Sequence, residues 1–304
     1  MTDTWYILGA GSIGKLLACK LQRAGLATCL LHRRGKTLTA EPVELVEGNT
    51  STSIPLRQLE PGQLDEIEIS RLVITTKASQ ALAAFLDVRD SLRADAPVIL
   101  LHNGMGTYEQ LCEYWNPDQV FAGTTTEAAW QDEKGRLIYA GHGKTWLGQA
   151  GRTTPPAWFT AWADKDPDVC WSTDIALDLW RKLLINCAIN PLTAIHRCRN
   201  GELLDNSEWR LQAETVCAEL ATVSRARGQA DLAETIRDQA FAVMRTTAAN
   251  QSSMLRDVLQ GRPTEIDYIT GYLCSEADRL GIPCPANQQL FKQVRLLDSL
   301  SHPP

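Results

Sequence analysis

The sequence lacks the long apolar run that a membrane-spanning helix requires. Hydrophobic residues make up 44% of the 304 residues, but no run of them approaches the roughly 18 consecutive apolar residues that cross a bilayer. The chain begins Met1-Thr2-Asp3-Thr4 and has no basic region before its first apolar stretch, whereas a secretory signal peptide begins with such a region. We therefore expect no membrane span, no signal peptide and a cytoplasmic location.

The sequence also lacks an excess of basic residues. Its 30 lysines and arginines are outnumbered by 36 aspartates and glutamates, which gives a formal charge of −6. Because a nucleic-acid-binding domain normally carries a basic face or stripe, we expect no nucleic-acid partner. The charge does not exclude small anionic ligands, since a few local basic side chains suffice to bind them.

Although nine cysteines are present, none of them forms a C-x-x-C pair. A zinc site needs closely spaced cysteine or histidine ligands, so we expect no metal. The odd number of cysteines, and their positions in apolar runs such as Ile185-Asn186-Cys187-Ala188, favour buried free thiols in a reducing compartment.

The length favours two domains, because one domain typically takes ~150 residues. Residues 1–168 alternate short apolar runs with segments of helical period, which predicts a doubly wound parallel α/β sheet. The predicted strands are 5–8, 28–32, 72–76 and 98–102, and segments 120–130 and 136–148 are expected to extend the sheet. Residues 173–300 show helical periodicity with few strand signals, which predicts an all-α domain over 169–304.

A glycine-rich turn follows the first predicted strand. Gly9-Ala10-Gly11-Ser12-Ile13-Gly14 matches G-x-G-x-x-G, and it opens a segment of helical period. In a dinucleotide-binding unit the first glycine makes the tight turn, the second lets the backbone approach the pyrophosphate, and the third packs the helix on the strand. The helix N-terminus also attracts phosphate. We therefore predict a dinucleotide site at these six residues.

The end of the second predicted strand indicates which dinucleotide binds. An NAD enzyme places an acid there to hold the ribose hydroxyls, but this chain reads Leu30-Leu31-His32-Arg33-Arg34-Gly35-Lys36 and has no acid. A guanidinium at Arg33 can pair with a 2′-phosphate, so the segment favours NADPH. The pattern leaves open which of Arg33, Arg34 and Lys36 holds the phosphate.

Three polar residues recur every four positions within an apolar helical segment. Lys182, Asn186 and Asn190 fall on nearly one helical face, and Pro191 is expected to end the regular helix near Asn190. They form either a surface stripe with an outward lysine or a polar stripe that faces a ligand. In the second case, the lysine can donate a proton or a strong hydrogen bond to a carbonyl oxygen.

Other polar residues lie where a site is expected, although each is weak evidence alone. Lys77 and Asn103 follow predicted strands, and ligands of open α/β sheets bind beyond the carboxyl ends of strands. Thr264 and Asp267 fit a variant of the capping box, which would leave Glu265 as an acid at a helix start. Asn250 lies in a segment that also fits a polar helix junction.

Taken together, these segments resemble the ketopantoate reductase family over nearly the whole chain. The lysine-to-proline run and the Thr-Glu-Ile-Asp segment are specific to the family, whereas the glycine fingerprint is not. The segments that carry the resemblance are Gly9-Ala10-Gly11-Ser12-Ile13-Gly14, Thr75-Thr76-Lys77, His102-Asn103-Gly104-Met105-Gly106, Gly123-Thr124-Thr125-Thr126, residues 182–194, Asn200-Gly201-Glu202-Leu203, Ser252-Ser253-Met254 and Thr264-Glu265-Ile266-Asp267-Tyr268.

The resemblance implies an N-terminal Rossmann-type domain over 1–168 that binds NADPH. It also implies a helical substrate and catalytic domain over 169–304, as in 6-phosphogluconate dehydrogenase-like folds, with the active site in a cleft between the two. The implied activity is reduction of 2-dehydropantoate (ketopantoate) to (R)-pantoate in pantothenate and coenzyme A biosynthesis.

The resemblance also assigns roles to individual residues. Lys182 matches the catalytic lysine that donates to the C2 carbonyl oxygen, and Glu265 matches an acid that positions substrate and cofactor. The remaining matches are substrate contacts at Asn103, Asn186, Asn190, Asn200, Asn250 and Ser253, and cofactor contacts at the six glycine-turn residues, Arg33, Lys77 and Asn103.

Two alternatives stay open. The nearer one is a reductase of the same architecture that acts on another 2-oxo acid. The other is a non-catalytic NADP-sensing protein, which the presence of both Lys182 and Glu265 disfavours. The sequence allows either a monomer or a homodimer.

Overall fold

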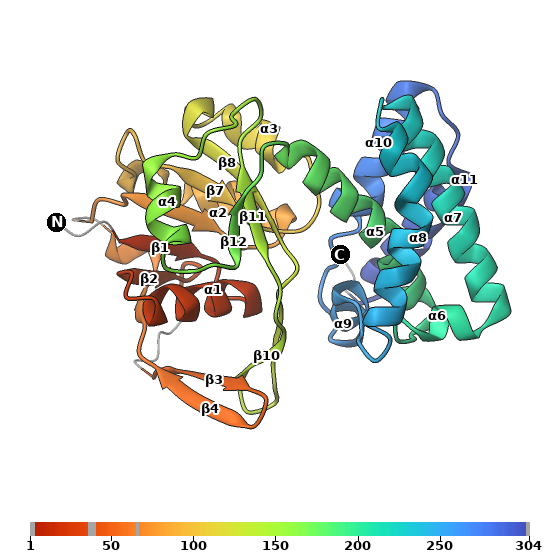
Figure 1. The fold of residues 1–304 in the computed structure, drawn as a ribbon. Coiled ribbons are helices and arrows are strands. Elements are labelled where there is room, and N and C mark those ends of the chain that lie inside the picture. The colour runs from red at the N-terminus through yellow and green to blue at the C-terminus, as the bar shows by residue number, and fades with distance from the viewer. Residues whose placement is uncertain (1–3, 36–40, 65–66, 302–304) are drawn as a thin grey trace. The chain divides into compact units, whose positions relative to one another are not determined.

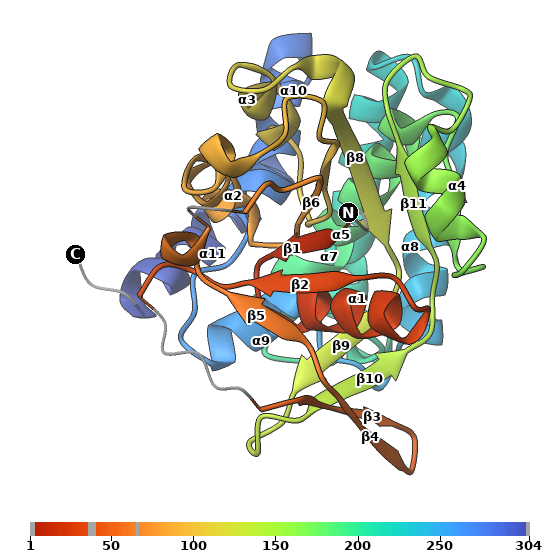
Figure 2. The same cartoon turned by 90° about the vertical axis from the view of Figure 1, so that its left-hand side faces the viewer.

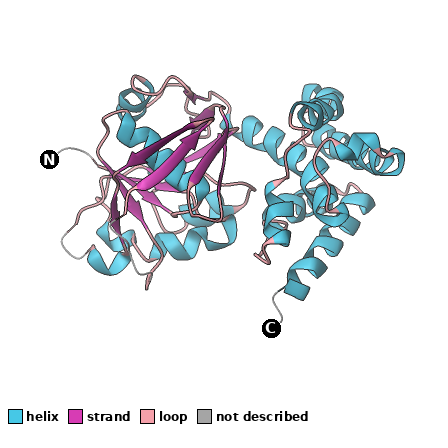
Figure 3. Cartoon of the chain, turned by 90° about the horizontal axis from the view of Figure 1, so that it is seen from below, coloured by secondary structure: helices cyan, strands magenta, loops and turns pink. Residues whose placement is uncertain are grey.

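The computed structural model describes residues 4–35, 41–64 and 67–301. The chain forms two compact units: the first comprises residues 1–102 and 107–178, and the second comprises 103–106 and 179–304. All the described strands belong to the first unit, and the second is helical (Figure 3). The division lies at 178/179, after the last strand of the sheet has ended at Trp171. The domain boundary at 168/169 stays a prediction.

The first unit is built on an eight-stranded sheet of order β12-β11-β8-β7-β6-β1-β2-β5. Neighbouring strands are parallel except β8 and β11. A doubly wound α/β sheet was predicted, and it is confirmed. The strands are β1 (Trp5–Leu8), β2 (Thr28–Leu31), β5 (Arg57–Leu59), β6 (Arg71–Ile74), β7 (Val98–Leu100), β8 (Val120–Thr125), β11 (Thr145–Gly148) and β12 (Val169–Trp171).

Helices cover both faces of this sheet (Figures 1 and 2). In β1, Tyr6 and Leu8 pack into one core with Phe85, while Trp5 and Ile7 pack into the other with Leu17. This alternation of side chains is what a strand buried on both faces requires. The helices and 3₁₀ turns of the unit are α1 (Ser12–Arg23), α2 (Ala78–Leu86), α3 (Thr107–Cys112), α4 (Ala157–Ala163), η1 (Pro61–Gln63), η2 (Arg89–Ser91) and η3 (Pro117–Gln119).

A second sheet of order β4-β3-β10-β9 lies on α1. Its strands are β3 (Val43–Glu47), β4 (Thr50–Ile54), β9 (Ala128–Gln131) and β10 (Leu137–Gly141). The prediction that 120–130 and 136–148 both extend the main sheet was therefore only half right, because β10 pairs with β3 and β9 pairs with β10 in the second sheet. Leu16 and Cys19 of α1 bury the apolar face of this small sheet, a contact that strand periodicity does not reveal.

The described residues of the second unit form helices joined by loops, without a strand. Asn206 caps the helix that begins at Ser207 by accepting hydrogen bonds from the backbone N–H groups of Glu208 and Trp209. The elements are α5 (Ile175–His196), α6 (Glu202–Asp205), α7 (Ser207–Ala226), α8 (Ala230–Thr246), α9 (Ser253–Leu259), the π-helix η4 (Asp267–Gly271), α10 (Tyr272–Leu280) and α11 (Pro285–Ser301). Among the described residues, no helix combines the length and the apolar character that a bilayer crossing demands.

Helix α5 does not end at Pro191, contrary to the prediction. Proline removes one backbone N–H and therefore the hydrogen bond to the carbonyl of Cys187, yet the helix continues to His196. Leu192, Thr193 and Ala194 are fully buried, and tertiary packing of this kind stabilises helices more than propensity does. The left-handed backbone of Arg197 (φ 51°) follows the end of the helix.

Candidate active site

The glycine-rich turn between β1 and α1 has the conformation that a dinucleotide cradle needs. Gly9 has φ +116°, and a Cβ at Gly14 would lie only 1.9 Å from the Gly9 carbonyl oxygen and 2.4 Å from Thr75 Oγ1. Thr75 in turn donates a hydrogen bond to the Gly9 carbonyl (2.9 Å). A Cβ at Gly11, by contrast, would meet nothing within 4 Å, which leaves the room that a pyrophosphate requires. Of the remaining members of the motif, Ala10 lies in the turn, and Ser12 and Ile13 begin α1.

Basic side chains lie near the carboxyl ends of β2 and β6. Arg33 and Arg34 are exposed just after β2, while Lys77 is the N-cap residue of α2. Lys36 lies outside the described residues. Glu60, which the sequence reasoning missed, accepts a hydrogen bond from the Gly35 backbone N–H (2.8 Å) and so holds this loop. The exposed guanidinium groups and the absence of an acid in the first turn of α1 suit a phosphorylated dinucleotide.

The polar stripe of α5 is not an exposed surface stripe. Lys182 and Asn186 are half-buried, and Asn190 is buried. Two residues before Lys182, Trp180 is fully buried and donates a hydrogen bond to Ser224 Oγ of α7 (3.1 Å). This anchor fixes the rotation of α5, so the face that carries the stripe is set by core packing on the opposite side.

The environment of Lys182 changes its proton affinity. Burial lowers the pKa of its ammonium from 10.5 to about 8, and the Glu265 carboxylate opposes this shift by raising the pKa. Desolvation penalises a charged lysine, whereas a nearby opposite charge favours it. A lysine with a pKa close to neutrality is suited to donate a proton, which an outward-pointing surface lysine is not.

The segment 103–106 brings Asn103 to Glu265. Although it follows β7 in the chain, it belongs to the second unit. Asn103 Nδ2 donates a hydrogen bond to Glu265 Oε2 (3.3 Å), and the Met105 backbone N–H donates one to the Tyr268 carbonyl of η4 (2.9 Å). Two predicted site residues that are 162 positions apart are thus in direct contact.

Glu265 is buried at the entry to the π-helix η4, and the capping box expected around it does not form. Thr264 donates its hydroxyl hydrogen bond to Asp298 of α11 (2.7 Å) rather than pairing with Asp267. The Glu265 carbonyl accepts hydrogen bonds from the Tyr268 and Ile269 backbone N–H groups. The Glu265 carboxylate is therefore not an exposed helix-start acid, and π-helical turns are frequent at functional sites.

Asn200 and Asn250 are joined through the backbone rather than through their side chains. The Asn200 N–H donates to the Asn250 carbonyl (3.0 Å), and Asn200 Nδ2 donates to Thr247 Oγ1 (2.8 Å). Asn200 Oδ1 is buried and, within the described part of the chain, accepts no hydrogen bond. An orphan buried acceptor of this kind costs stability unless a ligand satisfies it. Asn250 and Ser253 are both exposed.

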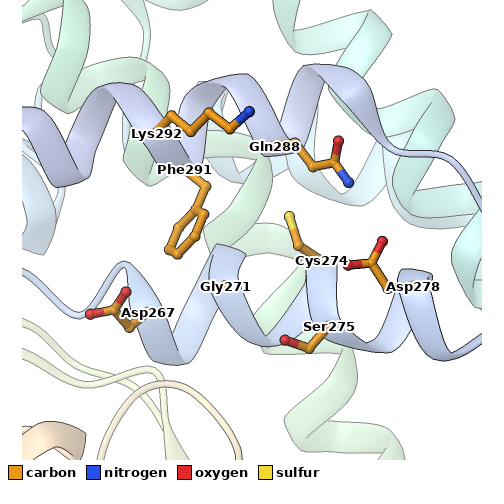
Figure 4. Close-up of a pocket in the computed structure, with 8 residues that line it drawn as sticks. All are labelled: Asp267, Gly271, Cys274, Ser275, Asp278, Gln288, Phe291 and Lys292. Carbon is orange, nitrogen blue, oxygen red and sulfur yellow. The ribbon is translucent and has the colours of Figure 1, made fainter.

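A groove of about 520 Å³ in the second unit lies apart from all these residues (Figure 4). It runs between α11 on one side and η4 with α10 on the other. None of the predicted site residues lines it, and its charged groups come from both sides. Its lining consists of Asp267, Gly271, Cys274, Ser275, Asp278, Gln288, Phe291 and Lys292. Within residues 4–35, 41–64 and 67–301, no cluster of His, Cys, Asp or Glu side chains is arranged to hold a metal.

A parallel α/β unit with an open glycine-rich turn, joined to a helical unit in which a desolvated lysine is coupled to a carboxylate, defines a nicotinamide-dependent oxidoreductase. Two family models match the chain: ketopantoate reductase PanE/ApbA over residues 5–152, and ketopantoate reductase PanE/ApbA C terminal over residues 174–298. The chain belongs to the ketopantoate reductase family.

Individual relatives agree with the family assignment. Over 96% of its length the chain is 37% identical to 2-dehydropantoate 2-reductase of Escherichia coli O157:H7, of which it covers 94%. It is 35% identical, again over 96% of its length, to the Vibrio cholerae protein of the same name, of which it covers 97%. The solved structure of a PanE/ApbA family ketopantoate reductase from Ralstonia eutropha JMP134 matches with a TM-score of 0.85 and 25% identity, over 98% of this chain and 99% of that one.

Proposed function

We propose that this protein reduces 2-dehydropantoate to (R)-pantoate with NADPH. The observation that carries the proposal is Lys182, whose pKa is lowered to about 8 by burial and which is coupled to Glu265. Family membership over both units and the curated relatives of that name support the substrate. We further propose that residues of the first unit hold the cofactor and residues of the second the substrate. A cytoplasmic location fits the nine cysteines, all of them free thiols.

The proposed chemistry gives Lys182 the central role. NADPH, when bound, supplies the hydride that adds to C2 of the 2-oxo acid. As that bond forms, negative charge develops on the carbonyl oxygen, and the Lys182 ammonium stabilises it and delivers the proton. Glu265, held by the Asn103 amide, keeps the lysine charged and positions the substrate. The addition of one hydride to C2 and one proton to the oxygen converts the carbonyl group to a secondary alcohol.

The amide and hydroxyl groups bind the rest of the substrate. Asn186, Asn190 and Ser253 are proposed to donate to its carboxylate and hydroxyl oxygens, and Asn250 to line the site. Asn200 Oδ1, the buried acceptor without a hydrogen bond in the described residues, is suited to accept the hydrogen bond of the substrate's hydroxymethyl group. This last contact would distinguish 2-dehydropantoate from 2-oxo acids that lack the hydroxyl group.

A substrate panel tests the proposed function. Steady-state consumption of NADPH is followed with 2-dehydropantoate and with 3-methyl-2-oxobutanoate, which lacks only the hydroxymethyl group. We expect kcat/KM to be about 10- to 100-fold higher for 2-dehydropantoate, because the shorter acid leaves a buried acceptor unsatisfied. Equal values for the two acids would reject 2-dehydropantoate as the preferred substrate and favour the rival reading, a reductase of other 2-oxo acids.

The choice of cofactor is tested at Arg33. We expect the wild-type protein to prefer NADPH strongly over NADH, and Arg33→Ala to lower kcat/KM for NADPH by at least about tenfold, the scale of a lost charged hydrogen bond. The value for NADH should hardly change, because NADH has no 2′-phosphate. Arg34→Ala is the matched variant on the same exposed loop: a loss there but not in Arg33→Ala would move the assignment to Arg34. If the wild type had equal kcat/KM with NADPH and NADH, the assignment of NADPH as the preferred cofactor would be rejected.

A further inference from the structure

Two buried hydroxyl groups join the last turns of α5 to the start of α9. Thr193 of α5 is fully buried, and its Oγ1 lies 2.7 Å from Oγ of Ser252, which is 7% exposed. Ser252 is the N-cap residue of α9. The two residues are 59 positions apart, so this contact is set by the tertiary fold and not by local sequence.

The neighbouring groups determine the direction of these hydrogen bonds. Ser252 Oγ accepts from the Leu255 backbone N–H (3.0 Å), and Thr193 Oγ1 lies 2.9 Å from the Asn190 carbonyl oxygen and 3.1 Å from that of Ile189. Each hydroxyl has one proton. All the groups are satisfied when Ser252 donates to Thr193 and Thr193 shares its one proton between the Asn190 and Ile189 carbonyls. The result is a chain of hydrogen bonds from the first turn of α9 to the backbone of α5 at Ile189 and Asn190.

The chain of hydrogen bonds ends next to the proline inside α5. Pro191, the next residue after Asn190, has no N–H and cannot hold its own turn of the helix. The Thr193 hydroxyl does not replace the bond lost at the Cys187 carbonyl, but it ties the neighbouring carbonyls of Ile189 and Asn190 to Ser252. At the other end of the chain, Ser252 directly precedes Ser253. The bridge thus fixes Asn190 and Ser253, two residues proposed to contact the substrate, with respect to each other.

We propose that Thr193 is a positioning residue for substrate binding, acting through its hydroxyl bridge to Ser252. The inference rests on the proposed substrate contacts of Asn190 and Ser253. Thr193 itself touches neither reactant. Its hydroxyl sets the spacing between two donors that must reach one small anion together, and a displacement of about 1 Å is enough to weaken such binding strongly.

The test uses Thr193→Val, which keeps the shape of the side chain and removes the hydroxyl. We expect KM for 2-dehydropantoate to rise about tenfold, in line with the loss of a buried hydrogen bond, while KM for NADPH and kcat stay within about twofold. Thr193→Ser restores the hydroxyl and should return KM to near the wild-type value. Thr222→Val is the matched control, because Thr222 makes the same bond to a helix carbonyl (2.9 Å to Ala218) on the exposed face of α7.

A second variant breaks the bridge from the other side. Ser252→Gly removes the hydroxyl but keeps a residue that caps helices nearly as well as serine, so it remains informative if Thr193→Val unfolds. It should raise the same KM, and the double variant should cost little more than either single change because both remove one interaction.

The outcomes separate this inference from the proposed site. Asn190→Ala is measured in parallel, and an unchanged KM in that variant would overturn the substrate contact on which the inference rests. If Asn190→Ala raises KM but Thr193→Val and Ser252→Gly do not, the positioning role is wrong while the site stands. The positioning role would also be overturned if kcat fell and KM for NADPH rose as strongly as KM for 2-dehydropantoate. The same holds if Thr193→Ser did not restore KM.

Discussion

Replacing Lys182 by alanine is expected to lower kcat by about 10²- to 10⁴-fold, the range that general acid catalysis contributes. The ammonium is the group proposed to meet the negative charge on the carbonyl oxygen, and it acts where desolvation has made its electrostatic effect large. Steady-state assays with 2-dehydropantoate and NADPH measure the loss. KM for NADPH should change much less, because Lys182 is not among the proposed cofactor contacts.

The pH dependence identifies the proton donor. Since burial lowers the pKa of Lys182 to about 8, the donor is protonated below that pH and loses its proton above it. In the wild type kcat/KM should therefore fall as the pH rises through about 8. Glu265→Gln should move this fall to lower pH, because the carboxylate raises the pKa of the lysine. In Lys182→Arg the fall should disappear, because a guanidinium stays protonated.

A matched lysine provides the control. Lys292 lies on the exposed face of α11, in the same unit as Lys182, and Lys292→Ala should leave kcat and its pH profile unchanged. Thermal unfolding of both variants checks that each one folds. Turnover close to the wild-type value in Lys182→Ala, or the same alkaline fall in that variant, would show that another group donates the proton.

The local features of the fold could be predicted because their causes are local. The turn at Gly9 and the packing of Gly14 follow from the absence of a Cβ, and β1 was located to the residue from one short apolar run before the turn. The helical periods of α7 and α11 were visible for a similar reason, since each buries one face. The first sheet followed from this alternation of strand and helix.

The features that sequence reasoning missed depend on contacts between distant residues. Thr264 looked like half of a capping box, but Asp298, 34 residues away, accepts its hydrogen bond. Pro191 looked like a helix end, but burial of the following residues keeps α5 helical. Neither outcome has a signal in the nearby sequence. The family resemblance marked Asn103 and Glu265 as site residues but did not predict their contact, because no periodicity links residues 162 positions apart.

Gly104 allows the segment 103–106 to pack closely against η4, where Asn103 contacts Glu265. It has φ +86°, and an alanine Cβ there would lie 2.6 Å from Tyr268 Cβ and 2.7 Å from the Tyr268 carbonyl oxygen. That oxygen accepts the Met105 N–H hydrogen bond. A methyl group at position 104 must therefore lift the segment 103–106 off η4 and move Asn103 away from Glu265. The glycine is required by both its backbone angle and the space around it.

We expect Gly104→Ala to lower kcat/KM for 2-dehydropantoate about a hundredfold, because a 1 Å displacement of positioning groups can cost that much. Gly106→Ala is the matched control: Gly106 also has a positive φ (+100°), but a Cβ there would meet only Tyr272 ring carbons at 3.4 and 3.6 Å. Both variants pay the backbone cost of a left-handed alanine, about 1–2 kcal/mol, and only Gly104→Ala also disrupts the contact with η4. A larger loss in Gly104→Ala than in Gly106→Ala, at similar melting temperatures, therefore measures how far activity depends on this contact. If both variants lost the same kcat/KM, backbone strain would explain the whole effect, and the contact with η4 would play no part in activity.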